Sequence, residues 1–476
     1  MVRIYCDSNI YRYLMPKHPS YNPELLDVFE SLKDKMLFTF SDAHLDDLKD
    51  SEFEYAKKDL LVMERYVKDN YFAHYFVKDL GTSVYLATPL TAFQDKNYKL
   101  YNEVLENPYD LDHLFSEFDD FPELGMVKSL LKTMYSVPIG AFAGYETREV
   151  DDKGQELIDR MVPGYNPFMT IGDFMQGMWP YSKSLLHDKK EFTELRRYIA
   201  SYMKNDEYGF EKWGMAFNER MKNSTIGKSY LEMIENMLST NQKKDLYQKF
   251  NYAYTLLETY NVTQERKKKG LKQFNMQSLN TDAHHAWFGS FNDYLITDDK
   301  GLQIKANIVY QLLKLPTKVL SSKDFINYKT IILGQEETIE KFSSSLNYDL
   351  KHSLLLSQEP DLLSSDSTSV FIPTHPYFNY FNRYQLNEEK KSITFFCNRK
   401  SHASFMMYRE IQLLIRKLNL LLGEDIDNRG EYEMNENEKY KDRAILRTWF
   451  NGNYKFAIYT SYGNWGSSVC LNLESF

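Results

Sequence analysis

The hydrophobic positions near the start of the chain switch between the period of a strand and the period of a helix. Residues 2–7, VRIYCD, alternate and carry β-formers up to a polar turn, which predicts a buried strand. A helix is expected from about Ile10, and apolar residues recur on one face of a second helix over 23–35. Residues 36–41, MLFTFS, predict another strand, and its last residue, Ser41, is a favourable N-cap for an acidic helix. This order of elements is typical of an α/β unit with a parallel sheet.

The segment 86–240 has a different pattern, with helical periods and no strand-like alternation. Prolines interrupt it at intervals, which predicts several separate helices rather than one long helix. The segment is about as long as a domain, so we interpret it as a helical insertion. A further long helix is expected over 242–260.

The α/β pattern returns after the insertion. Asn280 to Asp282 are expected to open a helix, DYLIT at 293–297 a strand, 301–313 a helix and TKVLS at 317–321 a last short strand. Segments 1–85 and 241–335 are therefore predicted to be two halves of one domain. Residues 340–476 alternate again around an amphipathic helix at 404–422, which predicts a smaller α+β domain.

Composition limits the classes of protein that this chain can be. A length of 476 residues with 43% hydrophobic and 26% charged residues predicts two or three globular domains. The net charge of −9 means that any binding of nucleic acid must rely on a local basic patch. Three cysteines without CxxC spacing exclude a disulfide scaffold and a cysteine-rich zinc site. We expect a cytoplasmic protein with no membrane partner, because neither a signal-peptide pattern nor a long apolar run is present.

Acidic residues recur where the predicted strands end. The residues are Asp7, Asp47 with its neighbour Asp46, Asp282, and the pair Asp298 and Asp299. Because sites in parallel sheets collect at the carboxyl ends of the strands, we expect these side chains to converge. Carboxylates without histidine or cysteine neighbours favour hard cations, so the expected cofactor is Mg²⁺ or Mn²⁺. Metal ions held in this way are suited to phosphodiester hydrolysis.

Each acidic position also has a structural interpretation. Asp7 would then be a turn-former at a strand end, and Asp46 and Asp47 would belong to a solvated helix face. Asp282 would be a carboxylate favoured by the dipole at a helix N-terminus, and Asp298 and Asp299 would be ordinary loop residues. We expect His44, His284 and His285 to be structural, because adjacent helical residues point about 100° apart and cannot easily serve one metal.

Three segments resemble motifs of the PIN-like nuclease family. IYCDSNIYRYL is similar to the first motif, a hydrophobic strand followed by Asp, a small residue, Asn and an apolar helix. FTFSDAHLDDL resembles the second motif, with Asp47 in the acidic position where Glu is common. NTDAHHAWFGSFNDYLITDDKGLQIKA resembles the closing half, with Asp282 and Asp299 in the acidic positions and Asp298 as an alternative. The long gap between the second and third acids implies an inserted domain.

The resemblance implies a metal-dependent endonuclease with a PIN-like fold, acting on RNA rather than DNA. Asp7, Asp47, Asp282 and Asp299 would be catalytic and would hold the metal together with Asp298. A role as a toxin or antiphage defence effector, with a protein partner bound through the insertion or the C-terminal domain, would fit the habits of the family. Two alternatives stay open, a non-catalytic PIN-like scaffold and a metal-dependent phosphatase or other hydrolase on a different α/β fold.

One basic run is a candidate for contact with nucleic acid. It comprises Arg266, Lys267, Lys268 and Lys269 and lies shortly before Asp282. These side chains would contact the phosphates of a substrate. A solvated helix end is the alternative interpretation.

Overall fold

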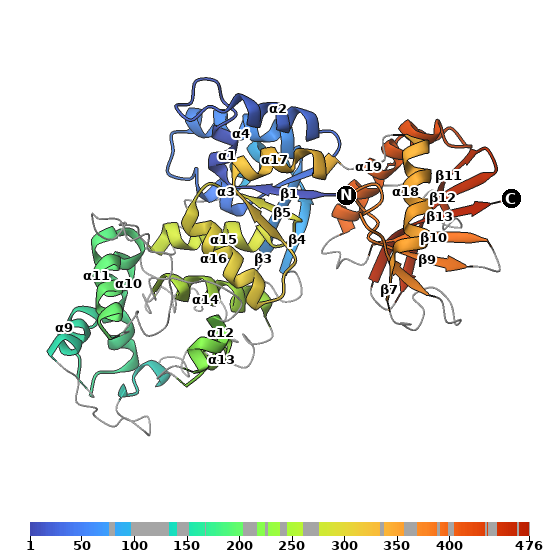
Figure 1. Cartoon of the computed structure of the whole chain (residues 1–476). Coiled ribbons are helices and arrows are strands. Elements are labelled where there is room, and N and C mark those ends of the chain that lie inside the picture. The colour runs from blue at the N-terminus through green and yellow to red at the C-terminus, as the bar shows by residue number, and fades with distance from the viewer. Residues whose placement is uncertain are drawn as a thin grey trace, which may run out of the picture. The chain divides into compact units, whose positions relative to one another are not determined.

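The computed structural model (Figure 1) describes the chain in segments. These are residues 1–75, 81–96, 133–139, 152–166, 168–202, 217–223, 227–238, 245–259, 276–333, 338–356, 369–387, 391–397, 404–433, 436, 445–463 and 466–475. The chain divides into two compact units. The first comprises Met1–Phe93 and His284–Phe476, and the second comprises Gln94–Ala283.

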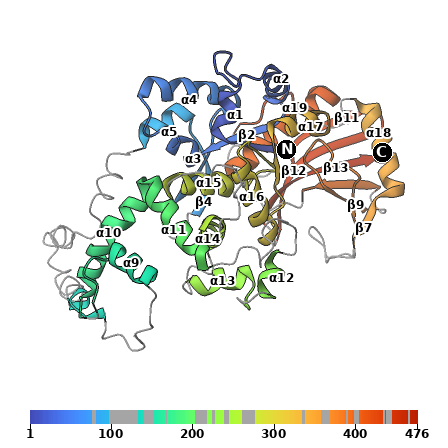
Figure 2. The same cartoon turned by 60° about the vertical axis from the view of Figure 1, so that its left-hand side comes forward.

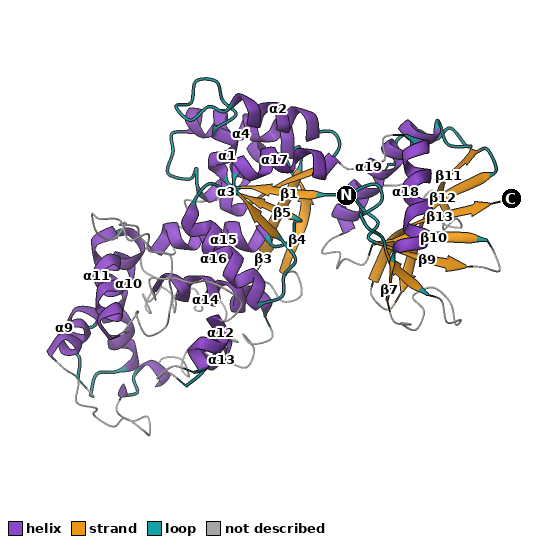
Figure 3. Ribbon diagram, in the orientation of Figure 1, coloured by secondary structure: helices purple, strands orange, loops and turns teal. Residues whose placement is uncertain are grey.

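A six-stranded sheet forms the centre of the first unit's α/β part (Figure 3). Its strand order is β4-β3-β2-β1-β5-β6, and every neighbouring pair is parallel except β3 and β4. The strands are β1 (Arg3–Cys6), β2 (Leu37–Ser41), β3 (Asn70–Tyr75), β4 (Gly81–Leu86), β5 (Tyr294–Ile296) and β6 (Lys318–Leu320). Strands β1, β2 and β5 are buried along their whole length, as expected for a sheet covered by helices on both faces.

Helices cover both faces of this sheet (Figures 1 and 2). One face carries α1 (Ser8–Arg12), α2 (Pro23–Leu32), α4 (Phe53–Val67) and α17 (Ser322–Leu333). The other carries α16 (Lys300–Leu312) and the C-terminal part of α15 (Met276–Gly289). Short helices α3 (Asp42–Asp46) and α5 (Pro89–Asp95) complete this part.

Sequence chemistry accounts for the helix starts and for the packing. The side chain of Asn22 accepts the Leu25 N–H and Pro23 occupies the first turn of α2, a favourable pairing at a helix start. Phe29 of α2 stacks on Phe38 of β2 with ring centroids 5.0 Å apart. Aromatic packing of this kind joins the helical layer to the sheet.

The C-terminal part of the first unit contains a separate seven-stranded antiparallel sheet. Its order is β11-β12-β13-β10-β9-β8-β7. The elements are α18 (Ile339–His352), β7 (Leu354–Leu356), β8 (Val370–Ile372), β9 (Arg383–Asn387), β10 (Ser392–Phe396), α19 (Ser404–Leu422), β11 (Ile445–Asn451), β12 (Tyr454–Gly463) and β13 (Gly466–Ser475). Phe342 of α18 contacts Phe395 and Phe456 of the sheet and forms part of its core.

The described part of the second unit is helical apart from one isolated bridge between Pro138 and Thr170. A buried ion pair with an N–O distance of 2.7 Å joins Arg196 of α11 to Glu258 of α14. The helices lying wholly within this unit are α9 (Asp152–Met161), α10 (Ile171–His187), α11 (Lys189–Tyr202), α12 (Phe217–Lys222), α13 (Tyr230–Met237) and α14 (Leu246–Thr259).

The structure confirms the prediction of an α/β protein with a parallel-containing sheet. The antiparallel pairing of β3 with β4 was not predicted. The second unit also extends through Ala283, beyond the segment 86–240 that we interpreted as the insertion. In the described part of the chain, no helix is long and apolar enough to cross a membrane.

Candidate active site

The order of the parallel sheet reverses direction at β1. The chain runs outward from β1 to β2 and β3, and later returns to place β5 on the other side of β1. Cys6 at the end of β1 pairs with Ile296 at the end of β5. Ligand sites of open α/β sheets lie outside the carboxyl ends of strands at such a reversal. Asp7 and Thr297 are the residues that follow these two strands.

Asp7 is held rigidly at this position. Its backbone N–H donates to the Ile296 carbonyl at 2.9 Å. One carboxylate oxygen accepts the Asn9 N–H at 2.7 Å, which caps α1, and the other accepts the Thr297 hydroxyl at 2.5 Å. The residue is only 5% exposed. Its position therefore depends on both halves of the α/β part, which are far apart in the sequence.

The surroundings of Asp7 disfavour its negative charge. Burial raises the pKa of the Asp7 carboxyl above its ordinary value, and the charge of Asp47 raises it further. His285, which is positive when protonated, acts in the opposite direction, as do the Thr297 hydroxyl and the Asn9 N–H, without cancelling the effect of burial. A buried carboxylate of this kind gains stability from a nearby positive charge.

Asp47 acts electrostatically on Asp7 and is more accessible, with a side chain 31% exposed. It follows α3 as the C-cap residue. Its Oδ2 accepts the Ser8 hydroxyl at 2.5 Å and lies 3.0 Å from His285 Nε2. Among the described residues, nothing donates a hydrogen bond to its Oδ1. Desolvation opposes the negative charge, but His285, which is positive when protonated, and these hydrogen bonds hold the pKa of Asp47 below its ordinary value.

His285 connects Asp47 to a buried polar network. Its Nδ1 lies 2.9 Å from the Tyr5 hydroxyl, which also lies 2.6 Å from Ser41 Oγ. His44 Nε2 donates to the Cys6 carbonyl at 2.7 Å while its Nδ1 accepts the Ser41 N–H at 3.1 Å. Burial, followed by the charge of His285, lowers the pKa of His44 to about 3, so this ring is neutral. The network fixes the imidazole of His285 that contacts Asp47.

Asp298 and Asp299 are near Asp7 but have structural partners. Desolvation and then the charges of Asp298, Asp7 and Asp299 raise the pKa of Tyr13, so all three carboxylates act on the same phenol. The two oxygens of Asp298 accept the N–H and the hydroxyl of Ser322 at 2.8 and 2.6 Å. Asp299 caps α16 by accepting the Leu302 N–H at 2.9 Å. Both residues therefore fix the helices that follow β5 and β6.

Removing the Asp298 carboxylate tests its structural role. Asp298→Ala removes both acceptors of Ser322 and is expected to lower the free energy of unfolding by about 1–3 kcal/mol, because hydrogen bonds to a charged group are lost. Urea unfolding followed by circular dichroism measures this change. Asp27→Asn, an exposed substitution on α2, is the control and should change stability by less than about 0.5 kcal/mol. A loss equally small for Asp298→Ala would contradict the structural role.

Asp282 lies inside a helix, and the predicted basic run lies outside the described residues. We predicted that Asp282 opens a helix, and this is wrong, because the helix α15 already includes Met276 and Asp282 lies in its middle. Helix-forming residues before Asp282 place the N-terminus of α15 earlier than the polar residues that we interpreted as its start. Asp282 also falls in the second unit, so its convergence with Asp7 stays a prediction. The basic run Arg266 to Lys269 lies outside the described residues.

His285 is the site residue that the sequence interpretation missed. We expected it to be structural because neighbouring histidines in a helix point in different directions. That geometry excludes a pair acting together, but it leaves either ring able to act alone. His285 is buried next to Ala286 and Trp287, and a polar ring in such a buried stretch was the available signal.

Asp7 and Asp47 carry carboxylates, the type of ligand that hard divalent cations prefer. Within the described segments, no three histidine, cysteine, aspartate or glutamate side chains are grouped to hold a metal. Mg²⁺ commonly keeps several waters and uses only one or two carboxylates together with substrate phosphates. Asp7 and Asp47 supply two carboxylates at this end of the sheet, and Asp47 raises the pKa of Asp7.

No protein-family model, curated protein or solved structure matches the chain. Its function is therefore argued from the site itself.

Proposed function

We propose that this chain is a metal-dependent endonuclease with a PIN-like domain, hydrolysing phosphodiester bonds in RNA rather than DNA. The observation that carries the proposal is the pairing of Asp7 with Asp47 at the point where the sheet order reverses. Asp7 is buried, which disfavours its negative charge, and Asp47 is accessible. A bound cation explains this combination of carboxylates better than a purely structural role does.

The residues have separate roles in this proposal. Asp7 and Asp47 would hold Mg²⁺ or Mn²⁺, and the resemblance adds Asp282 and Asp299 as further catalytic ligands. When bound, the metal would make water more acidic and offset charge that develops on the phosphate. Thr297 orients Asp7, and Ser8 and His285 orient Asp47. Supporting contacts of this kind commonly change metal affinity or activity by about 10–100-fold.

The other parts of the chain would serve recognition. Arg266, Lys267, Lys268 and Lys269 would contact phosphates of the substrate, which would offset the acidic balance of the chain locally. The helical unit and the C-terminal α+β part would select the substrate or bind a protein partner. A toxin or antiphage defence effector is the biological role that fits these additions.

Cleavage of labelled nucleic acid tests the proposed activity. The purified chain is incubated with end-labelled single-stranded RNA or DNA of the same sequence, in Mn²⁺ and Mg²⁺, and products are separated on denaturing gels. We expect metal-dependent cleavage of RNA that EDTA abolishes. Cleavage of small phosphoesters without cleavage of either polymer would instead indicate a phosphatase.

A non-catalytic scaffold that binds nucleic acid or protein is the second candidate. The capping contacts of Asp298 and Asp299 and the net charge of −9 favour it. Isothermal titration calorimetry with Mn²⁺ discriminates between the two candidates. A folded chain that neither binds Mn²⁺ nor cleaves RNA would support the scaffold.

A further inference from the structure

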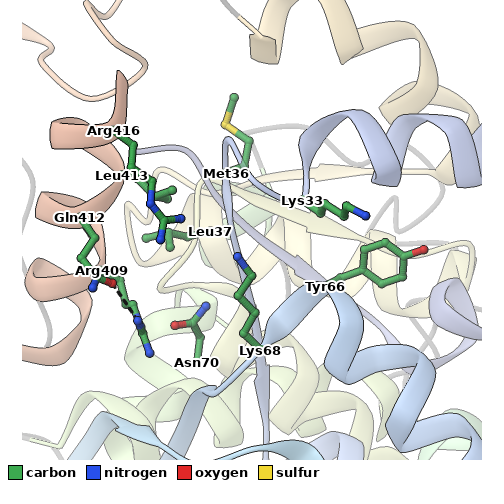
Figure 4. A pocket seen from close by; sticks show the side chains of 10 residues that line it. All are labelled: Lys33, Met36, Leu37, Tyr66, Lys68, Asn70, Arg409, Gln412, Leu413 and Arg416. Carbon is green, nitrogen blue, oxygen red and sulfur yellow. Dashed lines mark hydrogen bonds between the residues drawn. The ribbon is translucent and has the colours of Figure 1, made fainter. Parts of the chain in front are cut away.

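A cavity of about 100 Å³ lies where the α/β part of the first unit meets α19 (Figure 4). Its wall includes Leu37 at the start of β2 and Asn70 at the start of β3. These are the amino ends of parallel strands, whereas Asp7 follows the carboxyl end of β1. The cavity is therefore separate from the candidate active site and belongs to the opposite edge of the sheet.

The charged residues in the cavity wall are all basic. Lys33 and Lys68 come from the α/β part, and Arg409 and Arg416 come from α19. Each has a carboxylate partner, namely Glu30, Asp34, Asp69 and Glu431 respectively, at N–O distances of 2.7, 3.3, 2.6 and 2.8 Å. None of these carboxylates lines the cavity. The carboxylates balance the cations in total charge, but only the cations line the cavity. A ligand there meets cationic N–H donors, which favours an anion.

Two buried polar atoms of the wall residues have no hydrogen-bond partner among the described residues. They are Asn70 Oδ1 and Arg409 Nε. Asn70 is 3% exposed, and its amide nitrogen donates to the Phe38 carbonyl at 2.9 Å, which assigns the other amide atom as the oxygen. Figure 4 shows this amide between Arg409 and Lys68. The wall thus offers an acceptor as well as donors, and leaving such groups unsatisfied costs stability.

We propose that this cavity binds a phosphate group, with Lys68, Arg409 and Arg416 contacting its charged oxygens and Asn70 accepting a hydrogen bond from a P–OH. The volume exceeds that needed for one water but is well below the 300–1,000 Å³ of pockets for larger ligands. It admits a phosphate group and excludes a whole nucleotide. The group comes either from free phosphate or from the terminal phosphate of a polynucleotide.

Inorganic phosphate and sulfate, compared at matched ionic strength on the full chain, test the proposal. Phosphate carries an O–H at neutral pH, whereas sulfate has only acceptors and leaves Asn70 unsatisfied. We expect phosphate to bind about tenfold more tightly than sulfate in calorimetry and to raise the melting temperature, since an unsatisfied buried acceptor costs a factor of about that size. Equal affinity for the two anions would overturn the proposal.

The double variant Lys68→Gln and Arg416→Gln tests the residues themselves. Both side chains are partly exposed, at 48% and 38%, so the fold is expected to persist, and far-UV circular dichroism checks this. Phosphate affinity should fall by about tenfold or more, because two phosphate contacts are removed. Lys351→Gln, on an exposed lysine of α18, is the control and should bind phosphate as the parent does. Unchanged affinity in the double variant would refute the site.

Oligonucleotides distinguish the two sources of the phosphate group. A 5′-phosphorylated single strand that competes with inorganic phosphate, while its unphosphorylated form does not, would identify a polynucleotide end. Failure of both strands to compete, with phosphate still bound, would identify free phosphate. Neither result depends on cleavage, so failure of the proposed nuclease activity leaves this site intact.

Discussion

Asp7→Asn is expected to reduce metal-dependent RNA cleavage by about 10³-fold or more, because it removes the buried charge of the proposed metal pair. The exchange keeps the size of the side chain and an oxygen that can accept the Asn9 N–H. Asn is also as favourable an N-cap for α1 as Asp. The substitution therefore removes the charge and keeps the cap, but it also replaces the oxygen that accepts the Thr297 hydroxyl with an amide NH2. Rates measured under single-turnover conditions, with Mn²⁺ titrated for each variant, separate weaker metal binding from slower chemistry.

Stability provides an internal control for this result. Because burial raises the pKa of Asp7 above its unfolded value, the ionised carboxylate destabilises the fold at pH values above the folded-state pKa. That cost disappears as the pH falls below the ordinary value of 3.8. In EDTA, the Asp7→Asn variant should therefore melt at a higher temperature than the parent at neutral pH, and the difference should shrink as the medium is acidified.

A matched exchange of an exposed aspartate completes the comparison. Asp27→Asn on α2 should leave cleavage unchanged. If Asp7→Asn cleaves RNA at the parent rate in Mn²⁺, the assignment of the site to Asp7 is wrong. If the variant is inactive but melts below the parent, the loss reflects folding, and the electrostatic account of Asp7 fails.

The position of Asp7, directly after a buried strand, was predictable from the sequence because the residues that determine it are local. A buried strand ends just before Asp7, and the Asp7 side chain accepts the Asn9 N–H two residues later, which caps the following helix. The contact between Asp47 and His285 is not local. His285 meets Asp47 across 238 positions of sequence, and no periodic pattern encodes that distance. Sequence patterns locate strand ends well but do not specify which distant side chains meet there.

Asp298 and Asp299 show a different limit. A metal ligand and a helix cap both place an aspartate between a strand and the following helix, so the pattern cannot separate them. The hydrogen bonds to Ser322 and Leu302 show the structural role, and the metal role of these two residues stays a prediction. The unpredicted β3 has a similar explanation, since Asn70, a poor β-former, begins it and is held there by its bond to the Phe38 carbonyl.

Glu410→Leu is expected to lower the free energy of unfolding by about 3–5 kcal/mol, because it leaves the buried Arg3 charge without its partner. Arg3 of β1 and Glu410 of α19 are each 2% exposed, and two N–O contacts of 2.9 and 3.0 Å join them. The pair links the strand that ends at Asp7 to the C-terminal part of the same unit. Urea unfolding of the full chain, followed by circular dichroism and tryptophan fluorescence, measures the loss.

Adding Arg3→Met to Glu410→Leu should recover part of that loss, because it removes the unpaired Arg3 charge and puts an apolar group of similar size in its place. The Met1 amino group, 3.4 Å from Glu410 Oε1 in the parent, keeps its charge in both variants. Lys455→Gln is the exposed control, since Lys455 and Glu474 form a partly solvated pair worth less than about 1 kcal/mol. A double variant that is no more stable than Glu410→Leu would mean that packing around α19, rather than an unpaired Arg3 charge, accounts for the loss. Recovery would instead show that the ion pair specifies how β1 and α19 meet, and adds little stability beyond what apolar side chains supply.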